Sequence, residues 1–321
     1  MQAIDQAMFN FSPRIGLAVA VMVGFLVFAV ALDLSWDQFR RVLEKPKAPG
    51  IGLLAQYLIL PGVAFGIGLL MADTPSIALG LLLVACCPAG ALSNYLTGVA
   101  RGSVATSVSM TAVSTLFSVV VTPLLFAFWA SLNPATRAVL AQIEIDPKRV
   151  VMVLLIMLIV PVTAGMIIRA KRPGTADKIR LRARRIAGIV FAVVVAILLL
   201  GNIKVLGSFA TTALPPVLIT FAIAVALGWG LARVSGLLAA DRRAVTLEVA
   251  FQNVALAIGL AVAFFPALAG VAITSILWGV VHLTIGFAIA AMWMRMPIAD
   301  DSMATSDCAS LLRGKSVAAD Q

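Results

Sequence analysis

One acidic residue lies deep inside an apolar stretch of the sequence. Thirteen of the fourteen Asp and Glu residues fall in loops, termini or at the edges of apolar runs, and only Glu248 falls where a buried position is expected. Such a carboxylate must be protonated, paired with a basic side chain or bound to a cation, because desolvating a bare charge is too costly. No Lys or Arg lies at matching depth, so a proton or a metal cation remains. Alternatively, Glu248 lies near a helix end and extends to water, since Arg243 is close in sequence.

Hydroxyl side chains recur every three or four residues along the apolar run at 103–131. They are Ser103, Ser107, Thr111, Ser114, Ser118 and Thr122. On a helix this spacing places them in one polar stripe. Packing explains most of such a stripe equally well, because Ser and Thr bond to carbonyls of their own helix and let neighbouring helices approach.

A set of oxygen donors accompanies Glu248. Ser93, Asn94, Ser107 and Thr111 supply four neutral oxygens, and the last two lie one turn apart on one helix face. Oxygen donors without nitrogen or sulfur disfavour zinc and copper, and a single carboxylate carries too little charge for a divalent ion. Sodium is therefore the natural candidate. Gln252, one turn beyond Glu248, and Gln56 leave a second oxygen site open.

The composition indicates that a membrane surrounds most of the chain. Of the 321 residues, 62% are hydrophobic and 12% charged, and the mean hydropathy is +1.07. A helix needs roughly 20 apolar residues to cross the hydrocarbon core. We expect an all-α polytopic membrane protein with nine transmembrane helices, near residues 14–32, 50–71, 77–98, 103–131, 150–168, 186–202, 214–232, 244–265 and 270–294.

The basic residues predict the orientation in the membrane. With the N-terminus outside, 19 of the 24 Lys and Arg residues fall in loops on the inner side, as the positive-inside rule requires. We therefore expect a cell (inner) membrane protein with the N-terminus outside and the C-terminus in the cytoplasm. The longest polar link, residues 169–185, is expected to be a cytoplasmic loop that attracts anionic lipid rather than nucleic acid.

Two of the nine spans are interrupted midway. Residues 87–94 contain Pro88 and Gly90, and residues 248–253 contain Glu248, Gln252 and Asn253. Paired interrupted helices in two halves of a chain indicate the midplane site of a secondary transporter, although ordinary kinks have the same appearance. We expect one membrane domain, residues 1–298, with halves at about 14–131 and 150–294. Residues 299–321 are expected to be a disordered cytoplasmic tail.

The chain resembles the bile acid:sodium symporter family at these same residues. The matching motifs run in order: Cys86-Cys87-Pro88-x-Gly90-x-x-Ser93-Asn94, Ala100-Arg101-Gly102, Ser107-x-x-x-Thr111-x-x-Ser114-Thr115 and Glu248-Val249-x-x-Gln252-Asn253. The resemblance covers most of residues 30–290. It implies an inverted repeat with core and panel domains and two unwound helices that cross. It also implies a nine-helix member that lacks the first helix of the ten-helix bacterial form.

The resemblance further implies residue roles. One sodium would be held by Ser93, Asn94, Ser107, Thr111 and the Glu248 side chain. A second would be held by Gln56, Gln252 and the backbone carbonyls of Glu248, Val249 and Phe251. Substrate contacts would come from Asn253 and His282, although without the family a lone histidine is more often an interhelical hydrogen-bonding residue. Leu283 departs from the pattern, because a bacterial bile acid carrier has asparagine there, which argues against bile acid as the substrate.

These features predict a sodium-coupled symporter of a small organic anion, with Na⁺ as the coupling ion and no organic cofactor. A proton-coupled or uncoupled anion carrier of the same fold is the main alternative, in which Glu248 titrates and the hydroxyls only pack. A membrane enzyme is disfavoured because the sequence contains no HExxH and no GxSxG. A channel is disfavoured because a pore usually needs rings of identical groups.

Overall fold

Helices make up all the regular structure in the part of the chain that the structure describes. The computed structural model describes residues 13–142, 147–201, 203–296 and 298. Within these ranges there is no named strand, and a single isolated bridge joins Ala89 and Gln252. The expected all-α class is confirmed. The expected tail at 299–321 lies outside the described residues.

The helix bounds follow the apolar runs of the sequence. In chain order the helices are α2 (Pro13–Ala31), α3 (Trp36–Glu44), α4 (Lys47–Leu54), η1 (Ala55–Ile59), α5 (Leu60–Leu69), α6 (Pro75–Cys86), α7 (Ala91–Val99), α8 (Val104–Leu132), α9 (Pro134–Gln142), α10 (Pro147–Lys171), α11 (Pro173–Gly201), α12 (Ile203–Val234), α13 (Ala239–Ala250), α14 (Val254–Phe264) and α15 (Ala269–Arg295). Each expected span coincides with one helix or with consecutive helices.

Several of these helices are long and apolar enough to cross a membrane. Among the described residues they are Lys47–Leu69, Val104–Leu132, Gly207–Val234 and Ala269–Arg295, and a fifth span arises if the bent pair Val21–Ala31 and Trp36–Glu44 counts as one. Shorter apolar helices occur at Pro75–Cys86 and Val254–Phe264. A polytopic membrane protein is thereby confirmed, and the total of nine crossings stays a prediction.

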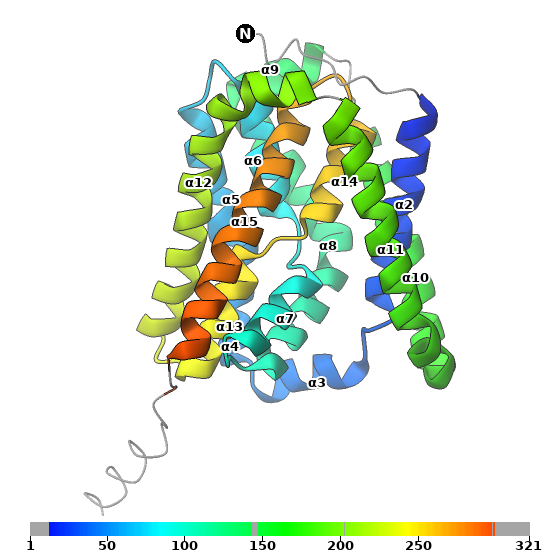
Figure 1. Cartoon of the computed structure of the whole chain (residues 1–321), viewed down its shortest axis with the longest axis vertical. Coiled ribbons are helices and arrows are strands. Elements are labelled where there is room, and N and C mark those ends of the chain that lie inside the picture. The colour runs from blue at the N-terminus through cyan, green and yellow to red at the C-terminus, as the bar shows by residue number, and fades with distance from the viewer. Residues whose placement is uncertain (1–12, 143–146, 202, 297, 299–321) are drawn as a thin grey trace, which may run out of the picture.

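The bundle has two groups of helices (Figure 1). α2, α10 and α11 pack against one another at one edge, and we call them the panel group. The core group comprises α4 to α8 and α12 to α15, in which α6 packs against α15 and α12 against α13. α14 belongs to the core group and also contacts α2, so it links the two.

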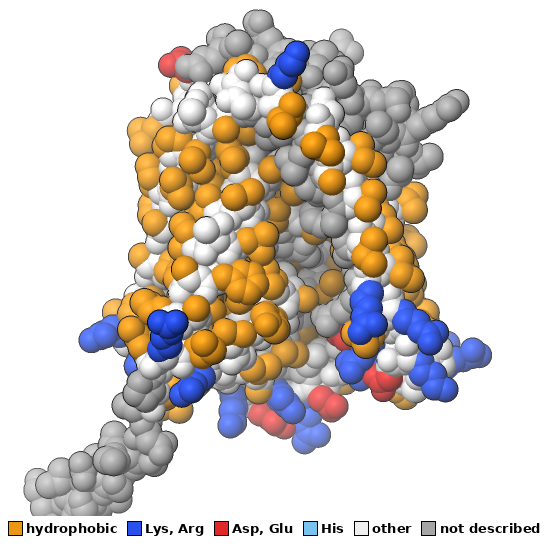
Figure 2. Space-filling view, viewed as in Figure 1, with side chains coloured by type: hydrophobic (Ala, Val, Ile, Leu, Met, Phe, Trp, Pro, Cys, Tyr) orange, Lys and Arg blue, Asp and Glu red, His pale blue; other side chains and the backbone are white. Residues whose placement is uncertain are grey.

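Charge separates the two ends of the bundle. Figure 2 shows the described Lys and Arg side chains gathered mainly at the end where α3 lies, below a broad apolar belt. We call this end the basic end. A belt of apolar side chains bordered by charge is the surface expected of a protein surrounded by lipid.

The polar link expected at residues 169–185 is helical instead of a loop. α10 continues to Lys171 and α11 begins at Pro173, which leaves only Arg172 between them. Proline suits the first position of a helix, and Arg and Lys are good helix formers, so polar composition did not prevent helix formation here. An ion pair between Arg169 and Asp177 joins the two helices, and Arg180 lies near the same carboxylate from within α11. The expected loop is therefore wrong.

The short helix α3 was not among the expected elements. It begins at the N-cap Ser35, whose backbone N–H donates to Gln38 Oε1 at 2.9 Å. Hydrophobic pattern alone missed it because it is only 9 residues long and rich in charge. α3 crosses the basic end and connects α2 of the panel group to α4 of the core group.

A glycine permits the close packing of α6 on α15. A Cβ atom at Gly80 would lie 2.6 Å from the Cβ of Thr274 and 3.0 Å from the carbonyl oxygen of Val271. Only glycine fits at such a distance between helices. This contact fixes the position of α6, which ends where the functional site begins.

Candidate functional site

The two interrupted helices meet at their breaks. Between α6 and α7 the chain is extended, and it lies antiparallel to the break between α13 and α14. The Gly90 N–H donates to the Phe251 carbonyl at 3.1 Å, and the Asn253 N–H donates to the Pro88 carbonyl at 2.7 Å. Each break thus satisfies backbone groups freed by the other, as the interior of a membrane protein requires. The expectation of two discontinuous crossing helices is confirmed.

Local sequence explains why each helix stops. Pro88 disfavours a helical conformation for the preceding residue, and Cys87 is extended with ψ of 154°. The N-cap of α14 is Asn253, whose side-chain Oδ1 accepts from the Leu256 N–H at 3.0 Å. The second break contains neither Pro nor Gly, so its polar residues were the only sequence signal.

Glu248 is fully buried and surrounded by hydroxyl groups. Its exposed fraction is 0%. The Ser93 and Ser107 hydroxyls each donate to Glu248 Oε1 at 2.5 Å. Thr111 Oγ1 lies 2.9 Å from Oε1 and 3.0 Å from Oε2. The alternative in which Glu248 extends to water is therefore wrong.

Asn94 completes this cluster from α7. Its Oδ1 accepts from the Ser107 hydroxyl at 2.8 Å and from the Thr111 hydroxyl at 3.1 Å. Thr97, which is also buried, donates to Ser107 Oγ at 3.2 Å. Sequence reasoning missed Thr97, although it lies one turn after Ser93 and so shares its helix face. We call Ser93, Asn94, Ser107, Thr111 and Glu248 the oxygen cluster.

The oxygen cluster contains more acceptors than hydroxyl protons. The single Ser107 proton faces both Asn94 Oδ1 and Glu248 Oε1. The single Thr111 proton faces Asn94, both Glu248 oxygens and the Ser107 carbonyl. One proton serves one good hydrogen bond. Some acceptor lone pairs in the cluster therefore receive no proton. A proton on Glu248 or a cation among the oxygens would use them.

The chemistry of these donors matches a hard monovalent cation. All the ligating atoms would be oxygen, and the described residues contain no group of three or more His, Cys, Asp or Glu that could hold a metal. A site with one carboxylate and several neutral oxygens is poorly charged for calcium and lacks the soft ligands of zinc. The residues fit Na⁺.

No basic side chain neutralises Glu248 among the ion pairs of the described residues. The buried Arg243 lies on the same helix, but its guanidinium donates to the carbonyls of Ala100 at 2.7 Å, Trp293 at 3.0 Å and Met296 at 3.1 Å. These carbonyls end α7 and α15, where cations are favoured. Arg243 thus joins helix ends and leaves the carboxylate to another partner.

The two glutamines singled out in the sequence lie together. Gln56 Nε2 donates to Gln252 Oε1 at 3.4 Å, and Gln252 Nε2 donates to the Val249 carbonyl at 2.8 Å. Gln56 Oε1 is buried and has no hydrogen-bond partner among the described residues. Gln56 lies in the π-helical turn η1, a feature frequent at functional sites. Residue spacing alone could not predict that these side chains meet.

Asn253 and His282 line a cavity of about 500 Å³ at the crossing. Gly90 and Val254, at the N-terminal ends of α7 and α14, line it as well. His282 is 6% exposed, and its ring lies 4.9 Å from that of Phe251. Its Nδ1 has no partner among the described residues, so the hydrogen bond expected of a packing histidine is not found at that atom.

The part of the hydroxyl stripe toward the C-terminal end of α8 has a packing role. Ser114 donates to the Thr111 carbonyl at 3.1 Å, and Ser118 donates to the Thr115 carbonyl at 2.7 Å. Thr122 donates to the Cys86 carbonyl at 2.6 Å, at the end of α6. The stripe therefore divides into hydroxyls that meet Glu248 and hydroxyls that satisfy backbone groups.

An apolar helical bundle with two broken helices crossed beside a buried oxygen cluster is the architecture of a secondary membrane transporter. The Sodium Bile acid symporter family profile matches residues 20–209. The chain belongs to this family. It is a sodium-dependent multi-pass membrane transporter and not an enzyme.

Several curated proteins are similar over most of the chain. The sodium-dependent transporter YocS of Bacillus subtilis, itself uncharacterized, is 30% identical over 277 residues, 86% of this chain and 83% of that protein. A probable chloroplastic sodium/metabolite cotransporter of Oryza sativa subsp. japonica, BASS2, is 33% identical over 243 residues, 75% of this chain and 55% of that protein. The Homo sapiens hepatic sodium/bile acid cotransporter is 30% identical over 268 residues, 78% of this chain and 74% of that protein.

Proposed function

We propose that this transporter moves a small organic anion together with sodium. The observation that carries the proposal is the surplus of acceptors over hydroxyl protons around the fully buried Glu248. A sodium ion held by the oxygen cluster would neutralise the carboxylate and use these lone pairs. The neutral hydroxyl and amide oxygens would replace the water that the ion loses.

A second sodium would lie beside Gln56 and Gln252. The buried and unpartnered Gln56 Oε1 supports this assignment, because an unsatisfied buried acceptor is costly unless a cation or water occupies its free lone pairs. The carbonyls of Glu248, Val249 and Phe251 would supply further oxygens from the end of α13. In the structure the Phe251 carbonyl accepts from Gly90 and the Val249 carbonyl accepts from Gln252.

The anion would bind in the cavity that contains Asn253 and His282. The N-terminal ends of α7 and α14 line this cavity, and helix N-termini attract anions through the helix dipole and free N–H groups. Two of the relatives are named for sodium with a metabolite or a bile acid. Leu283 lines the same cavity and stands where a bacterial bile acid carrier has asparagine, so we favour an organic acid other than a bile acid.

Coupling follows from charge. An anion binds better beside an occupied cation site, and sodium binds better beside the anion by the same factor. Binding of both would let the panel group rock against the core group and expose the crossing to the other side of the membrane. We place the basic end in the cytoplasm of a cell whose inner membrane holds the protein, with the N-terminus outside.

Uptake into proteoliposomes tests the proposal. Purified protein is reconstituted and offered a panel of radiolabelled organic anions under an inward gradient of sodium, potassium or choline. We expect at least one anion to accumulate only with sodium, and Glu248→Gln to abolish that accumulation. Accumulation that is equally fast in choline would overturn sodium coupling.

A proton-coupled carrier is the second candidate. The observation that favours it is that a protonated Glu248 would also resolve the surplus of acceptors, because it would add one donor to the cluster. Imposing a pH gradient in sodium-free vesicles separates the two. Uptake driven by protons alone supports this candidate, whereas uptake that requires sodium at every pH excludes it.

A further inference from the structure

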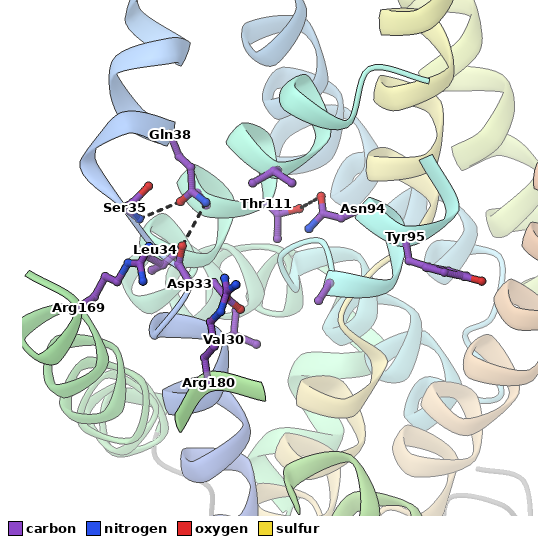
Figure 3. A pocket seen from close by; sticks show the side chains of 13 residues that line it. Val30, Asp33, Leu34, Ser35, Gln38, Asn94, Tyr95, Thr111, Arg169 and Arg180 are labelled. Atoms are coloured by element: carbon purple, nitrogen blue, oxygen red, sulfur yellow. Dashed lines mark hydrogen bonds and ion pairs between the residues drawn. The ribbon is translucent and has the colours of Figure 1, made fainter. Parts of the chain in front are cut away.

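A second cavity of about 420 Å³ lies between the panel group and the core group (Figure 3). Asp33, Arg169 and Arg180 line it from the panel side. Asn94 and Thr111 of the oxygen cluster line it from the core side. The sequence assigned Arg169 and Arg180 only to a loop, and nothing in the proposed sodium or substrate sites uses them.

The two arginines are only partly engaged. Arg169 Nη1 donates to Asp177 Oδ1 at 2.6 Å. Arg180 Nη1 reaches Asp33 Oδ1 at 3.3 Å, and its Nε lies 3.7 Å from Asp177 Oδ1. Both Arg180 contacts are longer than the roughly 2.7–2.9 Å that separates nitrogen and oxygen in a strong charged hydrogen bond. Because a guanidinium carries five N–H donors, both side chains keep donors for another ligand.

The arginines are also accessible. The Arg180 side chain is 48% exposed and that of Arg169 is 23% exposed. The Arg243 guanidinium, by contrast, is buried and has three carbonyl partners. Arg169 and Arg180 differ from it in both respects, so an anion that enters the cavity can reach them.

The cavity adjoins the one that contains His282. Val30 and Ala91 line both, so the two spaces are neighbours along α2 and α7. A ligand that moves from the crossing toward the basic end would pass these residues and reach Arg169 and Arg180. There it would lie between two guanidinium groups and the oxygen cluster, whose negative charge a bound cation would cancel.

We propose that Arg169 and Arg180 form a second anion-binding site, for a carboxylate or sulfonate group, at the basic-end mouth of the transport path. An anion there exchanges with Asp33 and Asp177 as partner of the guanidinium groups. The inference rests on the proposed function only in taking the bound anion to be the cargo. The site itself follows from the cavity and the two arginines.

Thiol labelling tests the site without any knowledge of the cargo. Val108, on α8, lines this cavity and is partly buried, so a Val108→Cys variant places a reporter thiol there. Cys86 and Cys87 are buried, and Cys308→Ser removes the remaining thiol. The detergent-solubilised protein is labelled in parallel with 2-sulfonatoethyl methanethiosulfonate, an anion, and with the trimethylammonioethyl reagent, a cation. The ratio of the two rates reports the local potential.

Matched arginine variants decide the outcome. We expect Arg169→Gln and Arg180→Gln each to lower the anion-to-cation ratio at least about threefold, because a cleft concentrates ions of opposite charge. Arg172→Gln and Arg182→Gln are the controls, since Arg172 lies between α10 and α11, Arg182 lies on α11, and both are exposed and do not line the cavity. Arg180→Lys should keep the ratio. Equal changes in the four Gln variants, or no change, would overturn the proposal.

Competition experiments then distinguish binding of an anion at the arginines from a general effect of their charge on labelling. Cholate, pyruvate and pantoate are each added during labelling by the anionic reagent. At least one should slow labelling severalfold in the Val108→Cys background and have no effect once both arginines are replaced by Gln. Failure of all three to slow labelling overturns the binding site. If slowing is seen while uptake proves independent of sodium, the proposed function fails and the anion site stands.

Discussion

The Ser107 hydroxyl lies 2.5 Å from Glu248 Oε1, although the two residues are 141 positions apart in the sequence. The contact joins α8 to α13, just before α13 breaks. It places a hydroxyl of the stripe against the one acid that the sequence puts inside an apolar run. The proposed sodium site depends on this contact and on the groups that hold it in place.

Removal of hydroxyl ligands should weaken sodium binding before it slows transport. Ser107→Ala and Thr111→Ala each delete an oxygen close to Glu248, and we expect the sodium concentration for half-maximal uptake to rise about tenfold in each, given the usual value of a hydrogen bond to a charged group. Sodium titration of initial uptake rates measures this. Ser118→Ala is the matched control, because Ser118 donates to the Thr115 carbonyl instead. An equal rise in half-saturating sodium in Ser118→Ala would contradict the division of the stripe into hydroxyls that meet Glu248 and hydroxyls that bond to backbone carbonyls.

Thr97 should act on the oxygen cluster through Ser107. Its hydroxyl donates to Ser107 Oγ at 3.2 Å, so it orients that oxygen without contacting Glu248. Thr97→Val keeps the shape and removes the donor, and we expect a rise of about threefold in half-saturating sodium, corresponding to one neutral hydrogen bond. The maximal rate should be unchanged. A tenfold effect would instead make Thr97 a direct ligand.

Arg243 should stabilise the lower half of the core group. Its three carbonyl partners end α7 and α15, and it is 5% exposed. Arg243→Gln leaves buried carbonyls unsatisfied, and we expect a loss of about 2 kcal/mol in the free energy of unfolding. Thermal unfolding in detergent, followed by light scattering, measures the shift in Tm.

Arg242→Gln supplies the comparison for Arg243. Arg242 makes one such bond, to the Leu237 carbonyl at 2.8 Å, and lies over the Trp229 ring. Its replacement should lower Tm by much less. An equal fall in Tm in the two variants would show that the bonds from Arg243 to the helix ends add no extra stability.

Gly286 should be needed for the ring contact beside the crossing. A Cβ atom at Gly286 would overlap the Phe251 ring, which packs against the His282 ring. Gly286→Ala should therefore displace Phe251, cost about 1–3 kcal/mol through overpacking, and raise the half-saturating concentration of the transported anion. Gly66→Ala is the control, since nothing lies within 4 Å of its added Cβ. Normal anion affinity in Gly286→Ala would show that the position of the Phe251 ring does not affect anion binding in the cavity.

The sequence predicted those parts of the fold that depend on local pattern. Apolar runs gave the helices, and Pro88 with Gly90 gave the first break. The second break was predicted from its polar residues alone. The expected loop at 169–185 failed because polarity indicates exposure and not the absence of a helix. α3 was missed because the expected helices rest on long apolar runs, and α3 is short and rich in charge.

The sequence predicted which residues belong to the candidate site better than it predicted which of them are in contact. Burial in an apolar run identified Glu248, and spacing on one face identified Ser107 and Thr111. The meeting of Gln56 with Gln252 depends on how distant helices pack, which spacing does not encode. Arg169 and Arg180 looked like any other inner-side basic residues, because only the tertiary structure shows that they line a cavity.

Equilibrium binding of radioactive sodium to the purified protein shows whether the Glu248 carboxylate holds a sodium ion. We predict saturable binding to the wild type that potassium does not displace, and loss of one bound ion per chain in Glu248→Gln, with Ser118→Ala binding as the wild type does. Unchanged sodium binding in Glu248→Gln would contradict the claim that this carboxylate and its neighbouring hydroxyls hold the coupling ion.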